Sequence, residues 1–265
     1  MHPLLNIAIQ AIRNASKIIL RCMDHLDKIE ITHKKRNDVV TEVDRIAEQE
    51  IINTIHKAYP NHNILAEESG FSSKDHSEFT WVIDPLDGTM NYVHQFPQFA
   101  TAISVKKGNE TEVAVIYDPI RNEMFTAVRG GGARLNDRRL RVSQIKKMDA
   151  ALLGTGFPFQ DLQYLKPYLA IFENIFPHAA DIRCAGSAVL DLAYVAAGRL
   201  DGFWEFSLKE WDMAAGALLI KEAGGMVSDF NAEENYLDNG NIIAGNPKIY
   251  KELTQYIQDA LQSAA

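Results

Sequence analysis

The stretch WVIDPLDGTMNYVH, residues 81–94, places two aspartates three positions apart directly after an apolar run. Val82 and Ile83 belong to that run and are expected in a buried strand, and Asp84 and Asp87 follow at its exit. Asp, Pro and Gly are ordinary turn residues, so a solvated turn is one interpretation of DPLDGT. A functional site is the other interpretation, and features elsewhere in the chain distinguish between the two.

Short apolar runs rich in β-branched residues surround this stretch and predict strands, several of them in antiparallel succession. The runs are NILAE (63–67), TWVID (80–84), FATAISV (99–105), EVAVIYD (112–118), NEMFTAV (122–128) and DGFWEF (201–206). Helical spacing and capping residues predict helices near residues 4–19, 41–59, 162–175, 187–198, 211–225 and from 247 onward. Strands and helices segregate into blocks, which indicates a layered α+β fold.

The domain organisation follows from the even composition of the chain. The 265 residues contain no Ser/Gly-rich or Pro-rich linker, and 46% of them are apolar, enough for a sizeable core. We expect one domain over residues 1–265, with an N-terminal α+β half at about 1–145 and a C-terminal α/β half at about 146–265.

Charge and cysteine content exclude several classes of protein. The net charge of −8 disfavours general nucleic-acid binding. A basic hairpin at residues 129–147 is the local exception, either a solvated face or a docking surface for an acidic partner. Cys22 and Cys184 lack paired spacing, so we expect two reduced, structural thiols. The N-terminus has no signal-peptide pattern and reads as an amphipathic helix, which predicts a cytoplasmic protein without a membrane span.

Several acidic residues stand where predicted elements begin or end. Glu67 and Glu68 end NILAE, Asp84 and Asp87 end TWVID, and Asp44 and Asp212 lie in first helical turns. Each has an ordinary structural explanation by itself, since an Asp in a first turn complements the helix dipole. Taken together, they are the oxygen ligands that hard cations such as Mg²⁺ prefer, and the chain offers no His/Cys ligand set.

The DPLDGT segment suits such a site. Pro85 stiffens the backbone after Asp84, so the Leu86 carbonyl and the Asp87 carboxylate can face the same side. Gly88 allows close approach of the backbone, and a helix beginning at Gly88-Thr89 would offer free amides to an anion. Metal ions beside a phosphate seat are the arrangement used for metal-assisted phosphoryl transfer.

At this point the sequence resembles a known family. EES (67–69), DPLDGTMNYVH (84–94) and WDMAAGALLIKEAGG (211–225) are similar to the signature regions of the inositol monophosphatases, which are magnesium-dependent, lithium-sensitive phosphatases. AVIYDPIRNE, GTGFPF and GSAVLDLAYVAAGR resemble the bacterial SuhB-type branch of that family. The resemblance runs from the first helix to the last, and it implies the layered αβαβα sandwich of the sugar phosphatases.

The resemblance also implies roles for individual residues. The metal ligands carry over onto Glu67, Asp84, the Leu86 carbonyl, Asp87 and Asp212. Asp44 and Thr89 match the pair that orients the attacking water and, with Glu67, make up the catalytic set. The substrate-binding set is Gly88, Thr89, Gly186, Ser187, Ala188, Glu205 and Asp212. Within it, Glu205 matches the acid that contacts a hydroxyl of the inositol ring, and Lys34 matches a basic residue near the site.

The implied reaction is hydrolysis of inositol-1-phosphate, with inversion and without a phosphoenzyme, by a water that two or three Mg²⁺ ions make more acidic. A different small sugar or nucleotide phosphate is an alternative substrate, although Met90, Asn91 and Tyr92 fit the inositol branch better than a nucleotide-acting one.

The second alternative is an interaction protein, because SuhB-type members join ribosomal-RNA antitermination complexes with RNA polymerase and Nus factors. The resemblance further implies a homodimer, with Arg183 and its loop as interface candidates.

Overall fold

The computed structural model describes residues 2–23, 25–26, 31–35, 38–74, 77–159 and 161–264, with the backbone alone at 31–35, 38–40 and 264. The side chain of Lys34, predicted near the site, therefore lies outside the described residues. No helix in these ranges is sufficiently long and apolar to span a membrane.

The described residues form two large sheets. The first has eight strands in the order β10-β9-β8-β7-β6-β5-β3-β4, antiparallel except for the β3–β5 pair. Its strands are β3 (Asn63–Ala66), β4 (Gly70–Ser72), β5 (Phe79–Asp87), β6 (Ala100–Lys107), β7 (Glu110–Asp118), β8 (Glu123–Val128), β9 (Gly132–Leu135) and β10 (Arg138–Arg139). Strands β1 (Ile31–Lys35) and β2 (Asp38–Thr41) form a separate small hairpin.

The second sheet has five described strands in the order β12-β11-β13-β15-β14. They are β11 (Leu152–Thr155), β12 (Asp181–Arg183), β13 (Gly202–Glu205), β14 (Met226–Ser228) and β15 (Ile242–Gly245). Strand β11 runs parallel to β12 and β13, whereas β15 is antiparallel to both of its neighbours.

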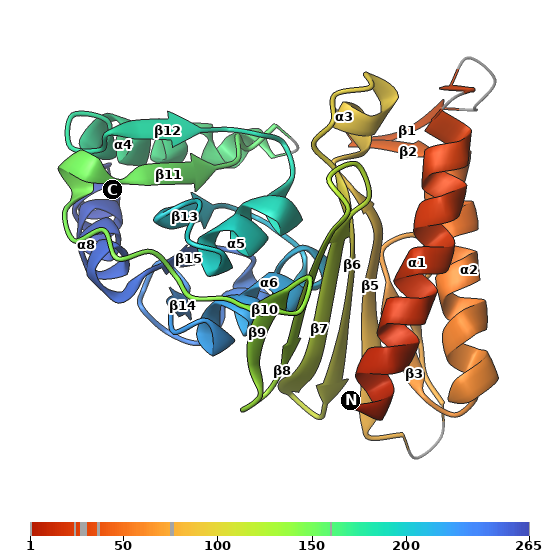
Figure 1. Cartoon of the computed structure of the whole chain (residues 1–265). Coiled ribbons are helices and arrows are strands. Elements are labelled where there is room, and N and C mark those ends of the chain that lie inside the picture. Colours follow the sequence, from red (N-terminus) through yellow and green to blue (C-terminus); the bar gives the residue numbers. More distant parts are fainter. Residues whose placement is uncertain are drawn as a thin grey trace.

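Helices separate and cover the two sheets, giving the αβαβα layers seen from right to left in Figure 1. The helices are α1 (Pro3–Met23), α2 (Glu42–Ala58), α3 (Thr89–Val93), α4 (Leu165–Ile175), α5 (Ala188–Ala196), α6 (Glu210–Glu222), α7 (Tyr236–Asn239) and α8 (Pro247–Ala264). Helices α1 and α2 cover the outer face of the first sheet, α5 and α6 lie between the sheets, and α4 and α8 cover the second sheet. The layered α+β sandwich expected from the sequence is confirmed.

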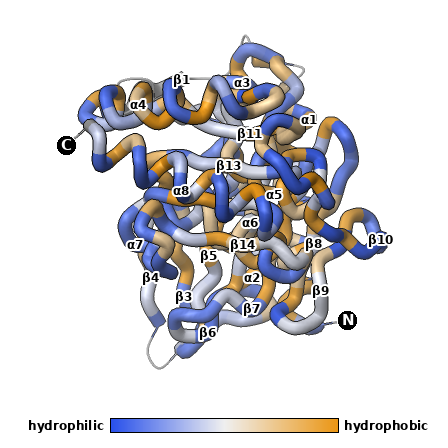
Figure 2. Tube along the Cα trace, turned by 90° about the vertical axis from the view of Figure 1, so that its left-hand side faces the viewer, coloured by the Kyte–Doolittle hydropathy of each residue, from blue (hydrophilic) through white to orange (hydrophobic). Residues whose placement is uncertain are grey.

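The extent of burial explains why the inner and outer helices differ in their hydrophobic pattern. Helices α5 and α6 pack on both sides and are apolar almost all round, with Leu190, Leu192, Leu219 and Ile220 all buried. Figure 2 shows hydrophobic and hydrophilic residues alternating along the outer helices α4 and α8, as expected for helices with one face in the core.

Most predicted elements are present, with one informative difference. The chain at Pro85, Leu86 and Asp87 was expected to be a turn after the strand, but these residues continue β5. Strands β1, β2, β4, β14 and β15 and helix α7 were not predicted; β4 and β14 have three residues each, too few to show a periodic pattern. The hairpin expected within residues 129–147 is confirmed: its turn lies at Asn136-Asp137, and both residues have the positive φ of a tight hairpin turn.

Candidate active site

A bulge in β5 points Asp84 and Asp87 in the same direction. Alternation along a strand would send residues three apart to opposite faces. Asp84 pairs with Ala102 and Asp87 pairs with Ala100, so β5 has one residue more than β6 between the two pairs. The extra residue restores a common face, and the Thr101 hydroxyl donates to the Pro85 carbonyl at 2.9 Å across the bulge.

That common face is the one covered by α5 and α6. Ala100 and Ala102, the partners of the two aspartates, belong to the core between the sheets. Ile83 and Leu86 instead belong to the core under α1 and α2. The apolar neighbours thus fix the strand on one side, and both carboxylates are presented on the other.

The second feature of the site is a hydrogen-bonded pair of Asp44 and Thr89. Asp44 lies in the first turn of α2 and is 1% exposed, and its Oδ1 accepts from the Thr89 hydroxyl at 3.0 Å. The same hydroxyl lies 3.0 Å from the Leu86 carbonyl, the alternative acceptor for its single proton. Thr89 opens α3 immediately after Gly88, so the helix start expected there is present.

Glycine is required at position 88 by the backbone. Its φ is +84°, and an added Cβ would lie 2.9 Å from the Gln98 carbonyl oxygen and 3.2 Å from that of Gly186. Both the left-handed conformation and this crowding exclude other residues. The chain can therefore turn from β5 into α3 while staying against the 184–188 loop.

Glu67 is brought beside Asp84 by the parallel pairing of β3 and β5. The register matches Ala66 with Ile83, and the Glu67 amide donates to the Ile83 carbonyl at 3.2 Å just beyond the strand. The Glu48 carboxylate holds the following turn, because it accepts from the amides of Glu68 and Ser69 at 2.8 and 2.9 Å. Glu48, which sequence reasoning missed, is one helical turn after Asp44 and is 3% exposed.

Helix α5 and the loop before it contact Asp87 directly. The carboxylate Oδ2 of Asp87 accepts from the Ser187 hydroxyl and, at 3.0 Å, from the Val189 amide. Asn91 of α3 holds the loop before α5, since its Nδ2 lies within hydrogen-bonding distance of the carbonyls of Ala185 and Gly186. The same Nδ2 also lies within hydrogen-bonding distance of the Gln98 carbonyl. The contacts of Asp87 and Asn91 with the 185–189 segment join residues about a hundred positions apart across the two halves.

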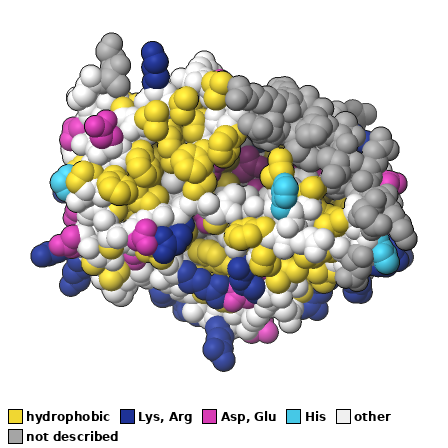
Figure 3. All heavy atoms as spheres, turned by 90° about the horizontal axis from the view of Figure 1, so that it is seen from above, with side chains coloured by type: hydrophobic (Ala, Val, Ile, Leu, Met, Phe, Trp, Pro, Cys, Tyr) yellow, Lys and Arg dark blue, Asp and Glu magenta, His cyan; other side chains and the backbone are white. Residues whose placement is uncertain are grey.

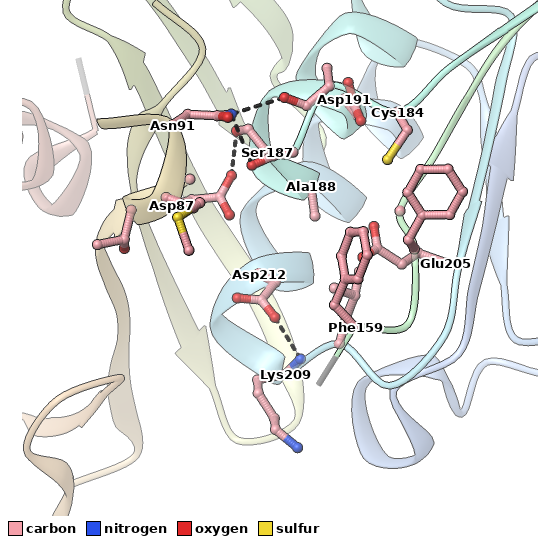
Figure 4. Close-up of a pocket in the computed structure, with 18 of the residues that line it drawn as sticks. Asp87, Asn91, Phe159, Cys184, Ser187, Ala188, Asp191, Glu205, Lys209 and Asp212 are labelled. Atoms are coloured by element: carbon pink, nitrogen blue, oxygen red, sulfur yellow. Dashed lines mark hydrogen bonds between the residues drawn. The ribbon is translucent and has the colours of Figure 1, made fainter. Parts of the chain in front are cut away.

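Asp212 enters from the first turn of α6. Its Oδ2 accepts from the backbone amide of Lys209 at 2.7 Å, so one oxygen caps the helix. Figure 4 shows Asp212 and Asp87 on neighbouring sides of the pocket, with Glu205 on the wall formed by the second sheet.

These residues line one cavity of about 980 Å³. Seen from above in Figure 3, acidic side chains lie in a hollow rimmed by hydrophobic ones. The lining includes the predicted site residues Glu67, Asp84, Leu86, Asp87, Gly88, Thr89, Gly186, Ser187, Ala188, Glu205 and Asp212. Asp44 reaches the cavity through its hydrogen bond to Thr89. Cys184 was expected to be structural, but it is exposed and lines the cavity.

Burial dominates the electrostatics of the cavity. Burial raises the pKa of Asp87 to about 6, and burial with repulsion from Asp87 raises the pKa of Asp212 to about 7. The pKa of Asp84 is well above its ordinary value because of burial and of repulsion from Glu67, Asp87 and Asp212. Burial also raises the pKa of Asp44 to about 6, despite hydrogen bonds from Thr41 and Thr89 that lower it. The carboxylates therefore repel one another in a desolvated cavity.

The donor set fits a hard divalent cation. The residues around the cavity supply carboxylate and carbonyl oxygens, and the charged groups that act most strongly on Asp84 are other carboxylates. In the described ranges, no three His, Cys, Asp or Glu side chains already stand as a ready-made ligand group. The chemistry of the donors therefore fits magnesium. A bound cation would offset the repulsion between these carboxylates.

Two further acids line the second-sheet wall. Glu205 ends β13, and burial, with repulsion from Asp191, Asp212 and Asp87, raises its pKa well above the usual range. Gly156 makes room for it, because a Cβ there would lie 2.0 Å from Glu205 Oε1. Asp191 of α5 is 3% exposed and was not singled out in the sequence, where residues 187–198 were interpreted only as a helix.

Comparison with known protein families gives a match over almost the whole chain. The model of the inositol monophosphatase family matches residues 1–263. Among curated relatives, Nus factor SuhB of Pseudomonas aeruginosa is 54% identical over 265 residues, covering 98% of each chain.

Solved structures agree with the fold. Extragenic suppressor protein SuhB of Bartonella henselae has a TM-score of 0.94 at 40% identity, covering 97% of this chain and 99% of that one. SaIMPase-II of Staphylococcus aureus, solved with bound inositol monophosphate, has a TM-score of 0.83 at 27% identity, covering 99% and 96%.

Proposed function

Because the chain belongs to the inositol monophosphatase family, a family of phosphatases, we propose that it is a Mg²⁺-dependent phosphomonoesterase that hydrolyses inositol-1-phosphate or a closely related polyol phosphate. One observation carries the proposal. The β5 bulge, the exit of β3 and the first turn of α6 direct Asp84, Asp87, Glu67 and Asp212 toward one cavity that also contains Thr89. A similar protein has been solved with inositol monophosphate bound.

We propose that Glu67, Asp84, the Leu86 carbonyl, Asp87 and Asp212 hold two or three Mg²⁺ ions. When bound, the ions would supply Lewis acidity, making a water more acidic and neutralising phosphoryl charge. The chain's own residues orient that water. With its proton donated to Asp44, the Thr89 hydroxyl still has lone pairs to accept a hydrogen bond from the water. The raised pKa of Asp44, about 6, suits a group that takes up a proton near neutrality.

The remaining residues hold the substrate. Gly88, Thr89, the 186–188 segment and Glu205 all line the cavity. We propose that the amides of Gly88 and Thr89 bind the phosphate and that the 186–188 segment and Glu205 contact the polyol. The hydrophobic rim, which includes Phe157 and Phe159, limits access of bulk water to the acids.

A substrate panel tests this function. The protein, with Mg²⁺, is assayed on inositol-1-phosphate, 3′-phosphoadenosine 5′-phosphate and fructose bisphosphate. We expect the highest kcat/KM with inositol-1-phosphate, loss of activity with EDTA and recovery with added Mg²⁺. Activity that survives EDTA, or a clear preference for the nucleotide, would contradict the proposal.

A second function is favoured by the relatives named Nus factor SuhB. We propose that the protein is cytoplasmic and that it also binds RNA polymerase and Nus factors, through a surface separate from the cavity. The basic hairpin provides one, since Arg134, Arg138 and Arg139 are exposed and form no ion pair within the described chain.

Matched variants separate the two functions. An Asp87→Asn protein should lose phosphatase activity and keep partner binding in a pull-down with purified RNA polymerase and Nus factors. An Arg138→Glu/Arg139→Glu protein should do the reverse. If Asp87→Asn abolished binding while the fold survived, a separate surface would be the wrong model.

We also propose that the protein is a homodimer with Arg183 at the interface. Arg183 is exposed and paired with Asp181 at 2.6 Å, so it is available at the surface. Light scattering should give twice the chain mass for the native protein and a larger monomer fraction for Arg183→Ala.

A further inference from the structure

The cavity has an acidic residue that the proposed reaction does not use. Asp191 lines the cavity and is 3% exposed. Burial, followed by repulsion from Asp87, raises its pKa well above the usual range. Within the described chain, neither a hydrogen-bond donor nor a basic side chain satisfies its carboxylate. Because the carboxylate lies on the cavity wall, a group bound in the cavity can donate to it, and such a bond would offset the cost of burying the charge.

The Gly154-Thr155-Gly156 segment places Asp191 next to Glu205. A Cβ at Gly154 would lie 3.6 Å from Asp191 Cγ, and a Cβ at Gly156 would lie 2.0 Å from Glu205 Oε1. Alternate residues of an extended chain face the same side about 7 Å apart, so the two carboxylates are neighbours on that face. Figure 4 shows them on one wall, with Cys184 near both and Asp87 across the cavity.

This spacing suits the hydroxyl groups of a polyol better than the alternatives. Hydroxyls on neighbouring carbons of one ring can donate to two adjacent carboxylates, and each bond to a charged acceptor is a strong one. An aryl or other non-hydroxylated leaving group would leave both acids desolvated and unpaired, which disfavours it. A cation at this wall would lack a third acidic, His or Cys ligand in the described residues.

We propose that Asp191 is a specificity-determining residue that, together with Glu205, accepts hydrogen bonds from neighbouring hydroxyls of the substrate's polyol ring. The proposal rests on the phosphatase function proposed above and adds the residue that selects the alcohol. Asp191 does not touch the phosphate, so it should affect binding of hydroxylated esters and spare the chemical step.

The experiment compares two substrates in three proteins, all with Mg²⁺. Inositol-1-phosphate carries the hydroxyls, and phenyl phosphate lacks them. The proteins are the wild type, Asp191→Asn, and Asp201→Asn as the matched control. Asp201 is also buried, but it accepts from the Leu152 amide at 2.7 Å and lies outside the cavity lining. Thermal unfolding of each protein checks the fold.

We expect Asp191→Asn to raise KM for inositol-1-phosphate about tenfold or more, the loss of one hydrogen bond to a charged group. Its kcat/KM for phenyl phosphate should stay within about twofold of the wild type, and Asp201→Asn should lower the melting temperature without changing the ratio between substrates. An equal fall in kcat/KM for both substrates, or no change in kcat/KM for either, overturns the role of Asp191. A wild type that hydrolyses phenyl phosphate but not inositol-1-phosphate instead refutes the proposed function, and the inference falls with it.

Discussion

Helices α2 and α6 begin with the same local structure. In α2, Asp44 Oδ2 accepts from the Thr41 amide at 2.8 Å, and in α6, Asp212 Oδ2 accepts from the Lys209 amide at 2.7 Å. Each aspartate is the third residue of its helix, the position from which a side chain can reach back to the N-cap. Each is also a predicted site residue.

The two carboxylates differ in what else they contact. Asp44 receives two hydroxyl groups as well, from Thr41 at 2.5 Å and from Thr89 at 3.0 Å. Asp212 receives no side-chain donor from the described residues, and it faces Asp87. Its pKa is accordingly about 7, against about 6 for Asp44. The comparison indicates that Asp44 is an internally satisfied group suited to moving a proton, whereas Asp212 needs a cation.

The largest expected effect comes from removing each charge in turn. Asp44→Asn and Asp212→Asn should each lower kcat/KM about a hundredfold or more, because one removes a proton acceptor and the other a metal ligand. Only Asp212→Asn should also weaken Mg²⁺ binding, measured by the Mg²⁺ concentration that gives half-maximal activity or thermal stabilisation. Equal Mg²⁺ affinity in the two variants would break the distinction.

The second prediction concerns pH in metal-free protein. Asp44, Asp87 and Asp212 have folded pKa values of about 6, 6 and 7, above the value of about 4 expected in the unfolded chain. The folded state therefore binds more protons, so this contribution to stability is complete below pH ~4 and is lost as pH rises through 6 to 7. The melting temperature in EDTA should fall over that range, and it should fall less with saturating Mg²⁺. A parallel fall in both conditions would show that other groups are responsible.

The third prediction isolates the α2 cap. Thr41→Ala removes the hydroxyl that donates to Asp44 and accepts from the Val43 amide at 3.1 Å, which should cost about 1 kcal/mol of unfolding free energy. Thr41→Ser, which keeps the hydroxyl, is the matched control and should lose little. Denaturant unfolding measures both, and equal stability of the Ala and Ser variants would show that the hydroxyl contributes nothing.

The smallest effect is expected at the α6 cap. The backbone amide of Lys209 donates to the Asp212 carboxylate, and Lys209→Ala retains that amide, so the unfolding free energy should change by no more than about 0.5 kcal/mol. The Mg²⁺ dependence of activity should also be close to that of the wild type. A loss of Mg²⁺ affinity as large as that of Asp212→Asn would assign the role to the lysine charge instead.

Several parts of this comparison could be predicted from sequence because they are local. The capping residues Thr41 and Asp44 are three positions apart, and the helix beginning at Thr89 follows a glycine. The long motifs around Asp84 and Asp212 identified the family, and the layered fold followed from it.

The rest depends on contacts between distant segments. The β5 bulge is visible only in the register against β6, so DPLD was interpreted as a turn. Glu48 supports a turn twenty residues away, and Asn91 holds a loop more than ninety residues away. The fit of Glu205 against Gly156 is a matter of interatomic space between two segments about fifty residues apart, and no local pattern encodes it.

The central claim is that acids from β3, β5 and α6 form a binding site for magnesium. Isothermal titration calorimetry of Mg²⁺ into the metal-free protein, with inorganic phosphate present, tests it most directly. We predict saturable binding in the wild type and in Asp201→Asn, and loss of at least one binding event in Asp84→Asn. Absence of Mg²⁺ uptake by the folded wild type, or unchanged uptake by Asp84→Asn, would contradict the account.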